Sequence, residues 1–226
     1  MQTIIEKLAV PKVILRYIMM NFTNIETIKK VILHVKIMNV LDNYSKDILE
    51  KAKKGFGCNC KHGRLTVAKW LYYTGNVDIH AANKHAHAFR LSCENGHLTV
   101  AKWLYSLGEE MDRVDAFQQS CTYGHITVTQ WIYSIGNCNV HSDDEYAFRW
   151  SCCNGHVAVA KWLYSLGDIN IHANSEGAFI GACHFGHLSI AQWLYSLGGI
   201  NIHIRDKFVF RWASEEVLDW LNTIKN

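Results

Sequence analysis

The chain has 226 residues, 49% of them hydrophobic, and a formal net charge of +3 at pH 7. This length and apolar content allow a large buried core, and a single proline suits a mostly helical structure. The most apolar stretch, residues 4–20, is interrupted by charged residues and that proline, which excludes a membrane span or a signal peptide. We therefore expect a soluble, intracellular protein with no membrane partner.

Charge is unevenly distributed along the chain. Residues 1–69 contain 13 Lys and Arg against 5 Asp and Glu, whereas residues 70–226 contain 10 against 15. We expect the two parts to meet different partners or surfaces. The basic cluster between Lys51 and Arg64 would attract nucleic acid or anionic lipid, but Phe56 is the single aromatic residue that interleaves with it. This favours a solvated helix face, and nucleic acid is not the partner we expect.

Residues 1–54 form a separate region in which apolar residues recur at helical spacing. They predict amphipathic helices that are either degenerate repeats capping an array or a small helical module. The spacing of six residues resembles the start of an F-box, a motif that docks on an adaptor subunit of ubiquitin ligases: Val10, Pro11, Ile14, Leu15, Ile18 and Phe22. The sequence leaves both interpretations of this region open.

From residue 55 the chain is a tandem array. The phrase GHLTVAKWLYSLG, Gly96 to Gly108, returns in closely similar form from Gly124, Gly155 and Gly186, with a looser copy from Gly63. Its tryptophans recur at intervals of 28 to 33 residues, at Trp70, Trp103, Trp131, Trp162 and Trp193. Periods in this range indicate a solenoid, in which each unit buries its apolar face against its neighbours.

Each unit predicts two helices separated by the first glycine of the phrase, which supplies the left-handed backbone of a turn. The first helix carries a phenylalanine seven residues before that glycine and a cysteine three residues before it: Phe56, Phe89, Phe117, Phe148 and Phe179, and Cys60, Cys93, Cys121, Cys152 and Cys183. The second helix has an apolar stripe that we expect between neighbouring units and a polar opposite side: Val100, Trp103, Leu104 and Leu107 against Thr99, Lys102 and Ser106.

After the second helix, a connector has a fixed apolar-His anchor, as in Val140-His141 and Ile171-His172, and then a variable tip. Variable tips on a fixed scaffold are where recognition is usually placed. We therefore predict partner binding by the tip residues Asn83, Lys84, His85, Arg113, Asp115, Asp143, Asp144, Glu145, Asn174, Ser175, Glu176, Arg205, Asp206 and Lys207. The acidic tip Asp143–Glu145 favours a partner with a basic patch.

These features resemble the ankyrin repeat over residues 55 to about 224. The resemblance implies an all-α solenoid of stacked antiparallel helix pairs with short connecting loops. The family's Thr-Pro-Leu-His is replaced in this chain, for example by His87-Ala88-Phe89-Arg90. The amino-acid pattern of the repeats, with Trp and Tyr in the second helix, further resembles ankyrin arrays of giant DNA viruses that infect amoebae. This resemblance implies a viral protein in the host cytoplasm.

The last unit, from Phe208, has lost the Gly-His turn and carries Glu215, Glu216 and Asp219, as expected of a solvent-facing cap. The domains predicted are thus residues 1–54 and an array at 55–226.

The repeated Cys and His residues form C-x-x-x-H pairs, such as Cys93 and His97, that are similar to zinc ligands. The glycine between them breaks the helix, and two ligands per repeat do not complete a tetrahedral site. We expect packed thiols in a reducing compartment and turn-bracing histidines, with no metal and no cofactor. The sequence has no phosphate-cradling glycine loop, nucleophile elbow or separate pair of carboxylates, so no catalytic residue is predicted.

The sequence therefore predicts a monomeric, non-enzymatic scaffold for protein–protein interaction. The alternative is a ubiquitin-ligase substrate adaptor, in which the F-box-like segment recruits ligase subunits and the array selects the substrate. Nucleic-acid binding through the basic end is a third, weaker interpretation.

Overall fold

The computed structural model describes residues 55–73, 84–108, 111–136, 138–202 and 213–225. The predicted F-box-like or capping helices of residues 1–54 lie outside these ranges. The chain divides into two compact parts, residues 1–88 and 89–226. Every described regular element is an α-helix, which confirms the predicted all-α class. No helix in the described ranges is both long enough and apolar enough to cross a lipid bilayer.

The first part contains one complete helix pair, α5 (Phe56–Lys61) and α6 (Leu65–Tyr73), and the start of α7 (Lys84–Glu94). Phe56 and Cys60 of α5 are buried, as are Val67 and Leu71 of α6. The looser copy of the repeat therefore folds as a helix pair of the predicted kind.

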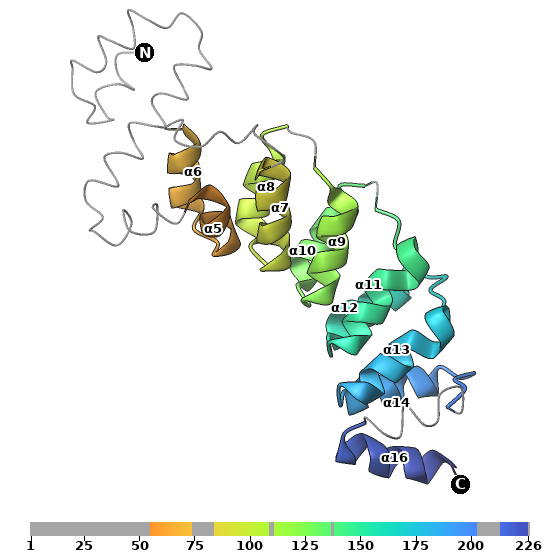
Figure 1. Cartoon of the computed structure of the whole chain (residues 1–226). Coiled ribbons are helices and arrows are strands. Elements are labelled where there is room, and N and C mark those ends of the chain that lie inside the picture. Colours follow the sequence, from red (N-terminus) through yellow and green to blue (C-terminus); the bar gives the residue numbers. More distant parts are fainter. Residues whose placement is uncertain (1–54, 74–83, 109–110, 137, 203–212, 226) are drawn as a thin grey trace, which may run out of the picture. The chain divides into compact units, whose positions relative to one another are not determined.

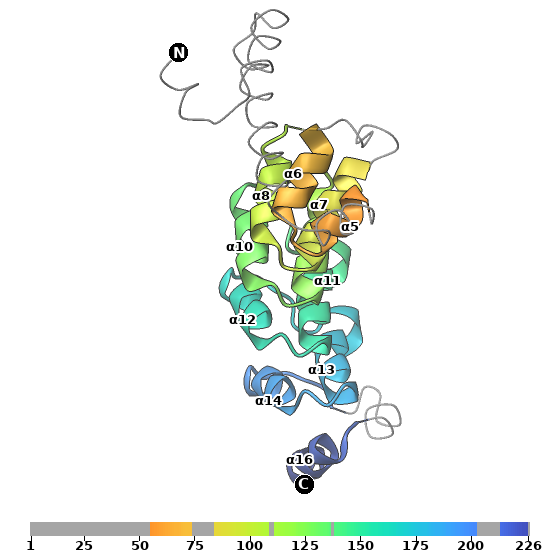
Figure 2. The same ribbon diagram turned by 90° about the vertical axis from the view of Figure 1, so that its left-hand side faces the viewer.

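The second part stacks further helix pairs from α7 to α14, each with a first helix, a Gly-His turn and a second helix, and ends in α16 (Figure 1). Figure 2 shows first helices in one column and second helices in another. The helices are the end of α7, α8 (Leu98–Tyr105), α9 (Arg113–Thr122), α10 (Ile126–Ser134), α11 (Ser142–Cys153), α12 (Val157–Ser165), α13 (Ala173–His184), α14 (Leu188–Ser196) and α16 (Glu215–Lys225). Val217 and Leu221 of α16 are buried, whereas its three acidic residues are exposed, as predicted for a cap.

The core consists mainly of the residues that recur in every unit. Phe89, Phe117, Phe148 and Phe179 are at most 1% exposed, and the repeated cysteines are fully buried, so the predicted buried thiols are confirmed. In the second helices the Val100 and Leu104 positions fill the space between units, and Lys102 is exposed as expected.

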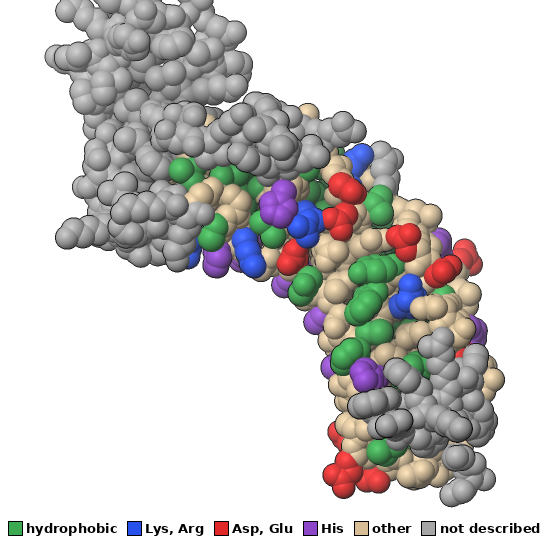
Figure 3. All heavy atoms as spheres, in the orientation of Figure 1, with side chains coloured by type: hydrophobic (Ala, Val, Ile, Leu, Met, Phe, Trp, Pro, Cys, Tyr) green, Lys and Arg blue, Asp and Glu red, His purple; other side chains and the backbone are tan. Residues whose placement is uncertain are grey.

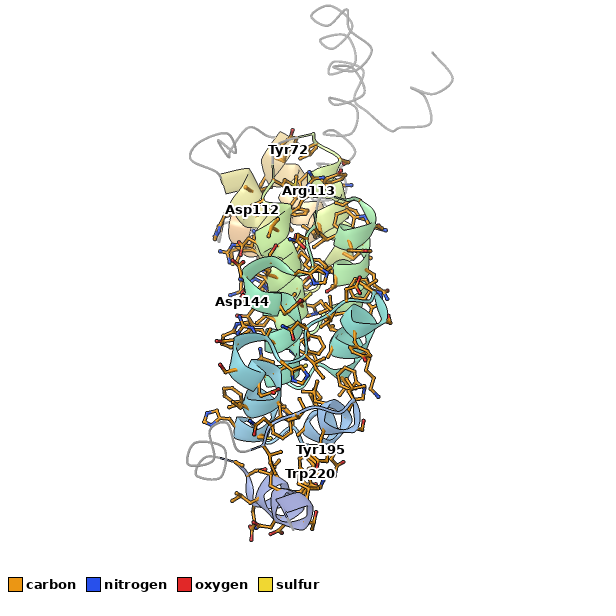
Figure 4. The ribbon with its side chains drawn as sticks, turned by 90° about the vertical axis from the view of Figure 1, so that its right-hand side faces the viewer. Tyr72, Asp112, Arg113, Asp144, Tyr195 and Trp220 are labelled. Carbon is orange, nitrogen blue, oxygen red and sulfur yellow. The ribbon has the colours of Figure 1, made fainter. Side chains whose placement is uncertain are left out.

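The tryptophans lie at the edge of this core and not at its centre. Trp103 is buried, but Trp131, Trp162 and Trp193 are partly exposed. Each of these three receives a tyrosine of the preceding unit edge-on, with ring centroids 5.5 to 5.8 Å apart. Figure 4 shows the same arrangement for Tyr195 and Trp220, between α14 and α16. The tryptophans therefore join neighbouring units along the outer side of the second helices.

Histidines of the Gly-His turns contact the preceding repeat and hold the two repeats together. His125 Nε2 lies 2.9 Å from the carbonyl oxygen of Glu94, and the same ring covers Gly96, where a Cβ would lie 2.5 Å from Nδ1. His156 repeats this arrangement over Gly124 and against the Thr122 carbonyl. The histidines brace the turns as predicted, but they do so across the boundary between units.

This position gives the array a pH dependence. Burial lowers the pKa of His125 and His156 below the ordinary value of 6.5, although a backbone hydrogen bond opposes the shift in each. The unfolded chain then binds protons more readily than the folded one, so stability is complete above pH 6.5 and falls as the pH falls through that value. We expect a lower free energy of unfolding at pH 5 than at pH 7.5 in urea titrations. The His125→Asn, His156→Asn double variant should lose less stability on acidification, and an undiminished loss would contradict this assignment.

Two first helices begin with a left-handed turn. Asp143, Asp144 and Glu145 have φ of 54°, 53° and 61°, and residues 174–176 repeat this conformation before α13 becomes right-handed. For residues with a Cβ this backbone costs about 1–2 kcal/mol each.

Replacing Ser175 in this turn should reveal that cost. We expect Ser175→Gly to raise the free energy of unfolding by about 0.5–1 kcal/mol and Ser175→Val to lower it by about 1–2 kcal/mol, because valine is the less tolerant of positive φ. Chemical denaturation measures both changes. If glycine destabilises the protein as much as valine does, the left-handed turn is wrong.

Candidate functional site

The predicted tip residues differ in how far their side chains are exposed. Asp143, Asp144, Asn174 and Ser175 are exposed, and Arg113 and Asp115 are partly exposed. Figure 4 places Asp112 and Asp144 on the same side of the stack, near the starts of α9 and α11. Six predicted residues have no described side chain: Asn83, Arg205, Asp206 and Lys207 lie outside the described ranges, and Lys84 and His85 begin α7. The exposed part of the tip prediction thus lies along one edge of the first helices.

Glu145 and Glu176 are corrections to that prediction, because their side chains point into the array. Glu145 is 6% and Glu176 is 4% exposed. Glu145 Oε1 lies 2.8 Å from His141 Nδ1 and accepts a hydrogen bond from the Asn170 backbone N–H at 3.3 Å. These carboxylates therefore hold a left-handed turn and the next connector together, and they are not free to meet a partner.

The second glutamate makes equivalent contacts. Glu176 lies 3.0 Å from His172 Nδ1 and accepts from the Asn201 N–H at 3.4 Å. Its connector reads Asn170-x-His172-x-x-x-Glu176, and the preceding one reads Asn139-x-His141-x-x-x-Glu145. This repeated spacing was the sequence signal that distinguishes these glutamates from variable tip residues.

Along the edge of the first helices, polar side chains join neighbouring units. Arg90 Nε lies 3.4 Å from Asp115 Oδ2, and Gln118 donates to Asp143 Oδ2 at 2.7 Å. Arg149 donates from Nε to the Asp144 carbonyl at 2.6 Å and from Nη2 to the Asp143 carbonyl at 3.0 Å. The guanidinium of Arg149 thus caps the left-handed turn, and the carboxylates of Asp143 and Asp144 remain exposed.

Large aromatic side chains that do not follow the repeat are exposed towards the C-terminal ends of α9, α11 and α13. Tyr123 is 50%, Trp150 38% and Phe185 54% exposed. Tyr123 and Phe185 occupy the position at which Asn95 and Asn154 end their helices in other units. In Figure 3, hydrophobic side chains gather over α11 and towards α13, with acidic side chains along the edge at the starts of α9 and α11. We call the exposed side of α9, α11 and α13 the first-helix face.

Trp150 lies near the middle of this face. Its ring centroid is 5.8 Å from that of Tyr146, one turn earlier in α11. On α13 the equivalent positions are Gly177 and Gly181, and Cys153 Sγ lies where a Cβ at Gly181 would be. The glycines let α13 approach α11 closely, so no α13 side chain at these two positions competes for the space beside the aromatic pair.

The second-helix face also exposes aromatic rings, but they recur in every unit. Tyr105, Tyr133, Tyr164 and Tyr195 are 37 to 40% exposed, and each packs edge-on against the tryptophan of the next unit. A residue required by stacking recurs in this way, whereas the aromatic residues of the first-helix face have no such requirement.

The cysteines are poorly suited to chemistry. Burial raises the pKa of Cys60, Cys93, Cys121 and Cys183 to about 12. All eight cysteines are free thiols, and three or more potential metal ligands do not cluster anywhere in the described ranges. Burial therefore keeps the repeated thiols protonated at neutral pH.

Comparison with known proteins gives the fold a name. Residues 117–206 match the family model for ankyrin repeats, three copies. The ankyrin repeat domain of human ASB11 is similar in structure, with a TM-score of 0.56 at 18% identity, covering 74% of this chain and 82% of that one. No curated protein matches the chain. Residues 117–206 are therefore similar in sequence to ankyrin repeats, and the array has the fold of an ankyrin-type solenoid.

Proposed function

We propose that the chain is a non-catalytic scaffold that binds another protein through the first-helix face and the exposed tips beside it. The observation that supports this most directly is the exposure of Tyr123, Trp150 and Phe185 at positions where stacking does not require them. Exposed aromatic side chains are costly to solubility, and they are enriched where proteins bind one another. Ankyrin repeats are a protein-interaction architecture, which agrees with this use of the face.

The exposed tips would supply the polar rim of the same surface. Asp143 and Asp144 are exposed at the start of α11, and Asn174 and Ser175 are exposed at the start of α13. Charged residues at a rim steer association and select partners more than they add affinity. The predicted tip residues without a described side chain, such as Lys84 and Asp206, belong to this proposal on the sequence alone.

Affinity capture with the full chain tests this proposal. The bait variant Trp150→Ala, Phe185→Ser should lose the bound protein, because two exposed anchors are removed. The matched control, Lys102→Ala, Lys161→Ala, Gln192→Ala, alters exposed residues on the second-helix face and should retain it. If the control loses the partner while the aromatic variant retains it, the binding site lies on the opposite side.

A second candidate, a ubiquitin-ligase adaptor, is favoured by one observation, the F-box-like spacing from Val10 to Phe22. In this proposal residues 10 to about 45 recruit ligase subunits and the array selects the substrate. The full-length variant Leu15→Asp, Ile18→Asp should then release ligase subunits and keep the partner of the array. Absence of ligase subunits from the wild-type capture would reject the adaptor and leave the scaffold.

The wording of the repeats supports a further proposal about source. It resembles arrays of giant DNA viruses of amoebae, in which case the protein engages a host or viral protein in the host cytoplasm. Immunolocalisation of the chain in infected amoebae would test this, and its absence from the cytoplasm would reject it.

A further inference from the structure

The aromatic pair on α11 has the properties of a site for a cation. Trp150 and Tyr146 lie 5.8 Å apart, their planes are inclined by 41°, and Trp150 is 38% exposed. The indole face is the most favourable aromatic surface for an ammonium or guanidinium group.

Other tryptophans of the same array already carry such a group. Lys102 Nζ lies 6.0 Å from the ring centroid of Trp131, and Lys161 Nζ lies 5.7 Å from that of Trp193. In both cases the lysine belongs to the preceding unit. At Trp150, no lysine or arginine among the described residues occupies this position.

Two carboxylates at the start of the helix that carries Trp150 favour a cation from outside the array. Asp143 and Asp144 are exposed at the start of α11, and the described contact to the Asp143 carboxylate comes from the neutral amide of Gln118. The nearby guanidinium of Arg149 is bound to two backbone carbonyls. Within the described ranges, no ion pair within 4.0 Å engages either carboxylate.

We propose that the partner binds through a basic segment, whose arginine lies on Trp150 while Asp143 and Asp144 compensate its charge. This inference rests on the proposed function and names the chemistry of its partner. Arginine fits better than lysine, because its planar, weakly hydrated guanidinium stacks on an aromatic ring. The carboxylates add attraction that weakens with ionic strength.

A displayed library of random twelve-residue peptides, selected against the full chain, tests the inference without knowledge of the partner. We expect the enriched peptides to share an arginine. Synthetic peptides with that Arg changed to Gln should bind wild-type protein about tenfold more weakly, the size of one cation–π contact with its supporting charge. The same peptide change should have little effect on the Trp150→Leu variant, which keeps an apolar side chain without a π face. This cycle isolates the contact between the two groups.

The carboxylates have a matched control in the cap. The Asp143→Asn, Asp144→Asn variant should weaken binding about threefold or more and flatten its salt dependence. The Glu215→Gln, Glu216→Gln variant removes the same charge from exposed positions of α16 and should bind normally.

The outcomes separate this inference from the proposed function. Peptides that depend on Trp150 but carry no essential basic residue would overturn the inference and leave the first-helix face as the binding site. An equal effect of Arg→Gln on wild type and on Trp150→Leu would overturn it in the same way. Peptides lost only from the Lys102, Lys161, Gln192 variant, or a selection without binders, would overturn both.

Discussion

Replacing Gly124 by alanine should destabilise the array by about 3 kcal/mol or more, the sum of a left-handed backbone and a steric clash. Gly124 has a φ of 79°, and the ring of His156 from the next unit occupies the space where the new Cβ would lie. The clash forces the histidine away from the Thr122 carbonyl and loosens the contact between two units. Urea denaturation followed by circular dichroism measures the loss.

Gly136→Ala is the matched control, since Gly136 has a φ of 84° but no atom within 4 Å of its Cβ position. It should cost only the backbone strain of about 1–2 kcal/mol. The double variant Gly124→Ala, His156→Ala should recover part of the loss by removing the ring. Equal losses in the two glycine variants would show that the histidine does not lock the units together.

Replacing Glu145 by serine should cost about 2–4 kcal/mol, because a buried carboxylate that holds two other groups is removed. His141 loses its partner, and the Asn170 N–H loses its acceptor. The control is Asp144→Asn, which alters an exposed carboxylate. It should change the free energy of unfolding by less than about 0.5 kcal/mol. Thermal unfolding of both variants makes the comparison. If Glu145→Ser leaves the free energy of unfolding unchanged, the buried role of this glutamate is wrong and it belongs with the exposed tip residues.

The stacked helix pairs could be predicted from the sequence because stacking requires the same residue types at the same positions of successive repeats. The phenylalanine, cysteine and glycine positions recur in every unit, and the structure buries or turns each as expected. The tryptophans lie between neighbouring repeats, as the apolar stripe predicts, but the stripe does not reveal that Trp131 and Trp162 stay partly exposed beside a tyrosine of the preceding repeat.

The candidate site was predicted less completely. The variable connectors correctly indicated the exposed Asp143 and Asp144, but variability alone did not separate them from the buried Glu145. That distinction depends on the left-handed turn at residues 143–145, and no glycine marks this turn in the sequence. Trp150 was overlooked because its importance lies in departing from the repeat, where other units have Leu91, Gln119 and Gly181.

The central claim, that a partner protein covers the first-helix face, is tested most directly by photo-crosslinking. A photoreactive phenylalanine analogue would replace Phe185, which is 54% exposed on that face, or Tyr164, which is 40% exposed on the second-helix face. After irradiation of the full chain in an extract of the source cells, the account predicts a discrete protein adduct from position 185. It also predicts loss of that adduct in the Trp150→Ala background and no adduct from position 164. An adduct formed from position 164 alone would contradict the account.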